Sequence, residues 1–245
     1  MNIKKILTQV DHRPWALPTT PWVYYQEWNE VCFMHWKVDS EALEKLLPPG
    51  VALDLFEGEA WVSLVPFTME RIRPSFLPAF APISNFHEIN LRTYVVKDGK
   101  PGVYFLNIES AKWLSTLLAK KLSGLPYENA SISRKTDGNQ QLYSSLNTLK
   151  GFRISARFTT SARKTAKSPL EIWLTERYCL YVDQGAKLYC YDIHHLEWEL
   201  EEVTLQQLTI DYQIGGIALQ QPPHHLNYSK GIRVVAWDKE LLDWE

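Results

Sequence analysis

The chain has 245 residues, of which 45% are hydrophobic and 22% charged, and it contains 10 Trp, 12 Tyr and 9 Phe. This composition excludes an intrinsically disordered chain and is sufficient for a sizeable core. The formal net charge of −2 gives no sign of the basic surface typical of nucleic-acid-binding proteins, so we expect no nucleic-acid partner. The length suits one large β-rich domain or two small ones. Because no linker-like segment divides the sequence, we expect a single domain over residues 1–245.

The cysteines and the N-terminal segment indicate the compartment. Cys32, Cys179 and Cys190 form no CxxC pair, and an odd number of widely spaced thiols is typical of free cysteines in a reducing compartment. The N-terminal segment reaches Asp11 and His12 before any apolar run of signal-peptide length. No window holds the roughly 20 apolar residues of a membrane-spanning helix. We therefore expect a soluble, cytoplasmic protein without a membrane partner.

The first predicted elements are a helix and a hairpin. Residues 39–50 begin with Asp39 or Ser40, either of which can cap a helix, and they end in Pro-Pro-Gly after a stripe of leucines. Residues 51–68 read as two strands joined at a Glu-Gly turn, which predicts a hairpin.

The segment 71–87 contains three prolines and no usable period. Proline removes backbone donors and fixes φ, so we expect no regular element here. Two interpretations stay open: a loop packed by its own apolar side chains, and a lid or oligomer contact.

A stronger hairpin signal follows, with Asp98-Gly99 between two alternating runs. Strand periodicity puts Glu88, Asn90, Arg92 and Tyr94 on one face of the first strand, and Val103, Phe105, Asn107 and Glu109 on one face of the second. If these faces line a cleft, Arg92, Glu88 and Glu109 meet there. If they face water, they are ordinary surface charges of an antiparallel sheet.

Residues 111–128 predict a helix of about five turns that stops at Gly124 and presents Tyr127 and Glu128 on a tight turn. The chemistry available at this turn depends on those two side chains. Neither is an amine.

The C-terminal half predicts mainly hairpins. Expected elements are a hairpin over 130–146, a strand over 151–160, a short helix with a capping box from Ser168, a hairpin over 174–195, a short helix over 203–213 and a strand over 231–238. Many hairpins with one long and several short helices predict an α+β fold with a mainly antiparallel, β-barrel-like core.

The sequence gives little support for a metal site, a hydrolase active site or a nucleotide-binding site. In each of the pairs His194-His195 and His224-His225, adjacent strand residues face opposite ways, so each pair offers one ligand to a common site. The chain has no GxSxG elbow, no GxGxxG and no GxxxxGK[ST] loop. We therefore expect no metal and no cofactor.

Glu176 and Arg177 are neighbours on a predicted strand, so their side chains diverge. A buried arginine requires a partner. Either Arg177 is held in an internal ion pair, or Arg177 or Arg92 presents its guanidinium to a carboxylate ligand. The sequence leaves both possibilities open.

Several motifs resemble the acetoacetate decarboxylase-like superfamily and, within it, the YqjF-like group of uncharacterised proteins (DUF2071). Two segments resemble the superfamily: WKVDSEALEKLLPPGVALD at 36–54 and the helix ending LSGLPYE. The group is resembled by HRPWALP at 12–18, EINLRTYV at 88–95, PGVYF at 101–105, LTERYCLY at 174–181 and IHH with Trp198 soon after. The resemblance to the group covers nearly the whole chain.

The resemblance implies a β-barrel-like core with an internal pocket, and homo-oligomers. In the decarboxylases the helix-ending motif is Pro-Lys-Lys, with one lysine forming a Schiff base and the second lowering its pKa. Tyr127 and Glu128 stand at the matching positions here, and Asn29 stands at or near that of a decarboxylase arginine. A tyrosine cannot form an imine, so Schiff-base chemistry is not expected at this site. Lys120 and Lys121 read as solvent-facing.

Three functions stay open. The first is a pocket that binds a small carboxylate- or carbonyl-containing ligand, with candidate ligand-binding residues Arg92, Asn90, Tyr127, Glu128, Glu176, Arg177 and His194. The second is a non-Schiff-base enzyme, lyase or hydratase-like, acting on a small keto acid, with Tyr127, Glu109 and Glu88 as candidate catalytic residues. The third is a structural protein whose core is filled.

Overall fold

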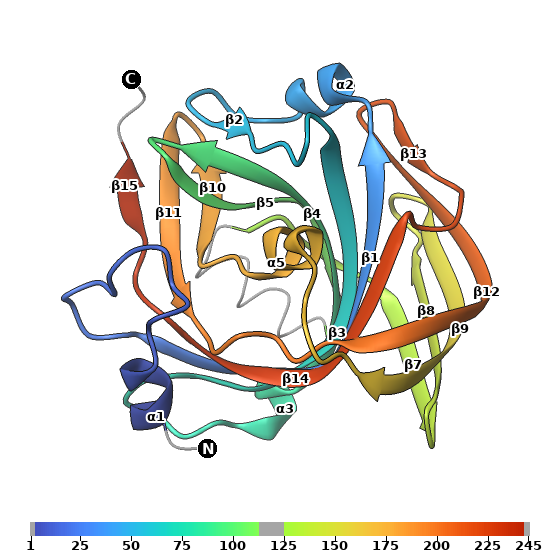
Figure 1. Ribbon diagram of the computed structural model, residues 1–245, viewed down its shortest axis with the longest axis horizontal. Helices are drawn as coiled ribbons and strands as arrows, with labels where there is room; N and C mark the ends of the chain where they lie inside the picture. The colour runs from blue at the N-terminus through green and yellow to red at the C-terminus, as the bar shows by residue number, and fades with distance from the viewer. Residues whose placement is uncertain (1–2, 113–124, 243–245) are drawn as a thin grey trace.

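The computed structural model describes residues 3–112 and 125–242 of the chain, and the fold they form is a β-barrel-like ring with a curved arm of further strands (Figure 1). The ring consists of β1 (Tyr24–Val38), β3 (Ala60–Pro74), β4 (Phe86–Lys97), β5 (Lys100–Ser110), β10 (Cys179–Gln184), β11 (Lys187–His194) and β14 (His225–Ala236). Its order is β11-β10-β5-β4-β3-β1-β14, and pairing of Ile193 and His194 with the end of β14 closes it. The ring is mainly antiparallel, with β10 and β5 parallel.

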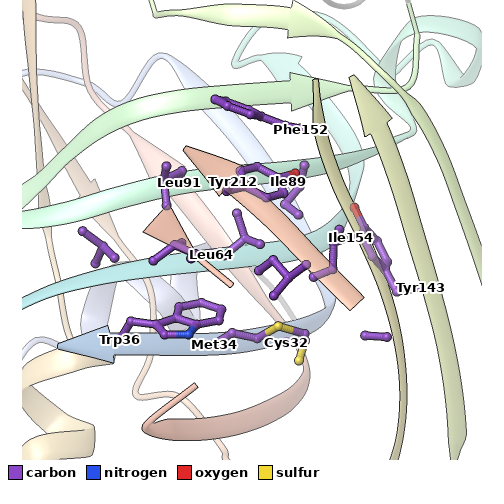
Figure 2. Packing of buried hydrophobic residues seen from close by; sticks show 14 of the residues in the cluster. Cys32, Met34, Trp36, Leu64, Ile89, Leu91, Tyr143, Phe152, Ile154 and Tyr212 are labelled. Atoms are coloured by element: carbon purple, nitrogen blue, oxygen red, sulfur yellow. The ribbon is translucent and has the colours of Figure 1, made fainter. Parts of the chain in front are cut away.

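The arm continues the sheet beyond β14. It consists of β12 (Glu201–Ile214), β9 (Phe152–Arg163), β8 (Gln140–Asn147) and β7 (Ser131–Asp137), with β13 (Ile217–Leu219) beside β12. Figure 2 shows how the arm covers the outer face of the ring: Met34, Leu64 and Leu91 point toward Ile154 and Tyr212. β1, β3 and β4 are therefore buried on both faces, one against the arm and one inside the ring.

This double burial decides an alternative that the sequence left open. Along β4 almost every residue is buried, including the polar ones. Glu88, Asn90 and Arg92 therefore do not face water as surface charges. They lie inside the ring.

The remaining elements are short. They are α1 (Ile3–Thr8), α2 (Ser40–Glu44), α3 (Ala81–Ser84), α5 (Pro169–Thr175), β2 (Ala52–Leu53), β6 (Tyr127–Asn129) and β15 (Glu240–Leu242). In α2 the Asp39 side chain accepts from the Ala42 amide at 2.8 Å, as expected of the cap, although the helix ends at Glu44, earlier than predicted. The capping box of α5 at Ser168 is confirmed.

Three predictions of secondary structure were wrong. Residues 203–213 belong to β12 and not to a helix, because a register shift between Leu205 and Gln207 places the half-buried Leu205 and Leu208 three residues apart, which imitates a helical period. The segment 71–87 contains the end of β3 and α3, whose Pro82 fits a first helical turn. The turn predicted at Glu57-Gly58 is present, with Phe56 paired to Glu59 across it, but the strand before it, β2, pairs with β4 and not with β3.

The hairpin turns are confirmed at Asp98-Gly99, at Gly138 and at Gly185, all with positive φ. The three cysteines are free and buried. Within the described residues, no helix has the length and hydropathy needed to cross a membrane. Most of the helix predicted over 111–124 lies outside the described residues.

Candidate functional site

The interior of the ring holds a cavity of about 200 Å³. Every strand of the ring contributes to its wall, and most of the lining side chains are apolar. The cavity extends from the end of α5, at Thr175 and the nearby Arg177, to Tyr24 and Asp238 near the opposite end of the ring. α5 lies within the outline of the ring in Figure 1, and the Leu174 carbonyl at its last turn accepts hydrogen bonds from Arg92 and Tyr94 of β4.

A row of polar side chains runs down the cavity wall on β4. Glu88, Asn90 and Arg92 alternate along the strand, so they share one face, and all three line the cavity while being at most 8% exposed. Arg92 lies opposite Ser63 of β3 and beside α5, whereas Glu88 lies opposite Phe67, four residues from Arg92 along β4. At about 3.3 Å per residue, Arg92 and Glu88 define two separate levels of the cavity.

Arg92 is a buried guanidinium that has no carboxylate partner in the described part of the chain. One of its terminal nitrogens, Nη2, donates to the Leu174 carbonyl at 3.3 Å, and its Nε has no hydrogen-bond partner. The guanidinium lies 5.7 Å from the ring centre of Phe33 and 5.8 Å from that of Tyr94. A buried charge is costly unless it is paired, so this site favours an anion.

Arg177 also lines the cavity, but it is paired. Its Nη1 donates to Asp54 Oδ2 at 2.5 Å and its Nε to the Trp173 carbonyl at 2.6 Å, while the guanidinium stacks on Trp173. Burial lowers the pKa of Arg177, and the Asp54 charge opposes that shift. Of the two interpretations of Arg177, the structure shows the internal ion pair, and its Nη2 remains without a partner.

Glu88 and Tyr127 form a polar pair at the second level. β6 pairs with β5 so that Tyr127 lies beside Ile108, and from there the Tyr127 hydroxyl donates to Glu88 Oε2 at 3.0 Å. Burial raises the pKa of Glu88 to about 8, although the hydrogen bonds from Tyr127 and Asn90 oppose the shift. Burial raises the pKa of Tyr127 as well. Near pH 7 Glu88 is therefore largely protonated and can donate a proton, whereas the Tyr127 hydroxyl keeps its proton and can donate a hydrogen bond.

Glu109 does not join this site. Between Phe105, opposite Arg92, and Asn107, opposite Leu91, β5 carries one extra residue, Leu106. This bulge reverses the alternation, so Glu109 lies on the face of the sheet that meets the arm. There its carboxylate accepts hydrogen bonds from Ser145, Asn147 and Tyr212.

Three other candidate side chains lie outside the cavity wall and have internal partners. Glu128 pairs with Lys150 at 3.2 Å and accepts from Asn147 at 2.9 Å. Glu176 pairs with Lys167 at 2.5 Å and accepts from the Tyr178 hydroxyl at 2.6 Å. His194 donates from Nε2 to the Ile6 carbonyl at 2.9 Å.

Some lining residues were not predicted from the sequence. His195, which directly follows β11, lines the cavity, whereas His194, the last residue of β11, does not. Adjacent extended residues point in opposite directions, but the pattern could not say which of the two points inward. Burial lowers the pKa of His195. Trp28 and Trp198 also line the cavity, and only Trp198 belonged to a motif noted in the sequence.

The two positions that match the site of the decarboxylases differ in their relation to the cavity. Tyr127 reaches the cavity, whereas Asn29 donates to Glu70 Oε2 at 2.5 Å outside its wall. Among the described lining residues there is no lysine. Lys120 and Lys121 lie outside the described residues. Over residues 3–112 and 125–242, no three His, Cys, Asp or Glu side chains are grouped to hold a metal.

The ring, the internal cavity and the strand order define an acetoacetate decarboxylase-like fold. The fold resembles acetoacetate decarboxylase from Legionella pneumophila subsp. pneumophila str. Philadelphia 1 (TM-score 0.63, 12% identity, 94% of this chain and 91% of that one). It also resembles the enduracididine biosynthesis enzyme MppR complexed with pyruvate (TM-score 0.63, 15% identity, 94% and 93%). An acetoacetate decarboxylase-like enzyme from Sphingomonas wittichii RW1 is similar as well (TM-score 0.62, 13% identity, 91% and 94%).

The sequence comparisons are more specific. Residues 25–233 match the model of DUF2071, described as an uncharacterized conserved protein. The uncharacterized protein YqjF of Bacillus subtilis (strain 168) is 35% identical over 229 residues, which cover 91% of this chain and 93% of that protein. The chain therefore belongs to the DUF2071 family.

Proposed function

We propose that this protein binds a small carboxylate- or carbonyl-containing molecule in the ring cavity, with Arg92 as the anchor of the carboxylate. The observation that carries the proposal is a buried guanidinium that faces a cavity and has no carboxylate partner in the described residues. An anionic ligand would supply the missing charge by a charge-assisted, potentially bidentate hydrogen bond. Complexes of MppR with pyruvate and with a pyruvate condensation product support an acid-binding cavity in this fold.

A calorimetric titration tests the proposal. Pyruvate and other short carboxylates are titrated into the wild-type chain and into Arg92→Gln, with Arg153→Gln as the matched control, because the Arg153 side chain is 62% exposed on the arm. We expect Arg92→Gln to lose at least tenfold in affinity and the control to bind as the wild type does. Equal binding by all three proteins would refute the anchor.

A second candidate is a non-Schiff-base enzyme, lyase or hydratase-like, on a small keto acid. The observation in its favour is Glu88, whose pKa of about 8 suits a proton-transfer group near neutral pH. Tyr127 would donate to a substrate carbonyl beside it. Turnover of any acid that binds, followed by the loss of turnover but not of binding in Glu88→Gln, would support this candidate over simple binding.

We further propose a cytoplasmic homo-oligomer. Three free, buried thiols suit a reducing compartment. Phe76, Leu77 and Phe80, which follow β3, are 81%, 49% and 63% exposed and suit a contact with a second copy. Light scattering on the wild type and on Phe76→Ser/Phe80→Ser checks the oligomer. A monomeric wild type would contradict it.

A further inference from the structure

The cavity wall beyond Arg92 is an aromatic enclosure. Trp28 and Trp198 stack with ring centres 6.3 Å apart, and Phe33 meets Trp198 edge-on at 4.9 Å. Phe67 lies 6.0 Å from Trp28. Flat aromatic faces and edges of this kind favour contact with another ring or with a branched alkyl group over contact with water.

The size of the cavity separates ligand classes. Its volume is about 200 Å³. An apolar cavity of about 150 Å³ holds one benzene molecule, so this one has room for a six-membered ring and a short acid arm. A three-carbon acid such as pyruvate would leave the aromatic side chains without contacts on one side, which forfeits dispersion and hydrophobic energy.

The charges of the wall restrict the ligand to one carboxylate. Arg92 is the cation without a carboxylate partner among the described lining residues, because Arg177 is paired with Asp54. The second level holds Glu88 and Tyr127, which are hydrogen-bonded to each other. A second carboxylate there would be placed beside an acidic group in an apolar site.

We propose that the ligand is a monocarboxylate that carries an aromatic or branched alkyl group, with its carboxylate at Arg92 and its apolar group against the wall formed by Phe33, Phe67, Trp28 and Trp198. This inference rests on the proposed function and adds to it the chemical class of the ligand. The buried Asn90 Oδ1, which has no hydrogen-bond partner, lies between the two levels and can accept a bond from a hydroxyl or amine of the ligand.

Matched pairs of probes test the class by titration calorimetry on the full chain at pH 7. The pairs are acetate with phenylacetate, and pyruvate with phenylpyruvate; phenylacetamide is the uncharged control. Each buried methylene increases affinity about fourfold, so we expect each phenyl acid to bind at least tenfold more tightly than its short partner. We expect phenylacetamide to bind at least tenfold more weakly than phenylacetate.

The variant Val65→Phe fills the wall beside Asn90, which Val65 faces across β3 and β4. We expect it to lose phenylacetate binding at least tenfold and to keep pyruvate binding. Val203→Phe makes the same change on the arm, away from the cavity, and should bind both acids as the wild type does. Circular dichroism verifies that each variant is folded, and the wild-type probe series is informative even if Val65→Phe is not.

The outcomes separate the two proposals. If acetate and pyruvate bind as tightly as their phenyl partners, the apolar class is overturned and the carboxylate site stands. If phenylacetamide binds as tightly as phenylacetate, the carboxylate anchor itself is overturned. If no probe binds, both proposals fail.

Discussion

At the scale of single residues, Arg92 and Arg177 are a natural comparison, because both are buried in one cavity wall and, within residues 3–112 and 125–242, only Arg177 has a carboxylate partner. Arg177→Gln would leave Asp54 unpaired, and we expect it to destabilise the fold by about 2–3 kcal/mol. Arg92→Gln removes an unpaired buried charge, and we expect a free energy of unfolding equal to that of the wild type or higher by about 1 kcal/mol.

Urea unfolding of the two variants measures this difference. Equal losses of stability in both variants would mean that the charge of Arg92 is already compensated by an internal partner and is not available to bind a ligand. The comparison is independent of any ligand, so it tests the Arg92 site even before a ligand is known.

Glu88 makes the stability of the protein depend on pH. Its pKa is raised by burial from 4.5 to about 8, so the folded state holds a proton that the unfolded state loses above pH 4.5. The contribution of protonated Glu88 to the free energy of unfolding is complete below pH 4.5, decreases as the pH rises, and is lost once the pH passes about 8. Each unit of pKa difference corresponds to about 1.4 kcal/mol.

Glu88→Gln replaces the neutral carboxyl with a neutral amide and removes this dependence. We expect wild type and variant to have similar free energies of unfolding at pH 4.5, and the variant to be more stable by a widening margin up to pH 8. Urea unfolding at pH 4.5, 6, 7 and 8.5 gives the curve. Parallel curves would show that Glu88 ionises in the folded protein as it does in water.

At the scale of elements, α5 positions the Arg92 end of the cavity, because its Leu174 carbonyl accepts from Arg92 and Tyr94. The helix has 7 residues and depends on its capping box at Ser168. We expect Ser168→Ala to cost about 1 kcal/mol of unfolding free energy and to weaken acid binding. Thr165→Ala, an exposed change in the same loop, is the control. Unchanged binding in Ser168→Ala would show that α5 forms without its cap.

Local chemistry explains which elements were predictable from the sequence. The caps at Asp39 and Ser168 and the turn at Asp98-Gly99 depend on nearby residues, and all three are present in the structure. The face of β4 that holds Glu88, Asn90 and Arg92 followed from simple alternation. That this face lies inside the ring depends on the arm, which covers the opposite face.

Two bulges explain the wrong predictions for Glu109 and for residues 203–213. The extra residue at Leu106 reverses the direction of Glu109, and the shift near Gln207 made β12 look helical. Neither position carries the glycine or proline that often marks such a site. Pairing of β2 with β4 is likewise a tertiary choice, because local alternation does not determine which strand becomes the neighbour.

At the scale of the whole molecule, the ring is shared with acetoacetate decarboxylases, whereas the residue that reaches the cavity from β6 is Tyr127. Incubation with pyruvate and borohydride, followed by mass spectrometry, tests whether the shared fold retains Schiff-base chemistry. We expect no labelled lysine in the wild type, because an imine requires an amine and the described wall offers none.

The variant Tyr127→Lys places an amine in this apolar wall, where burial lowers its pKa and favours the nucleophilic form. We expect that variant to be labelled at position 127, and Tyr104→Lys, a substitution outside the cavity wall, to remain unlabelled. Labelling of Lys120 or Lys121 in the wild type would overturn the assignment, since it would mean that an amine from the preceding segment reaches the cavity in place of the matching position.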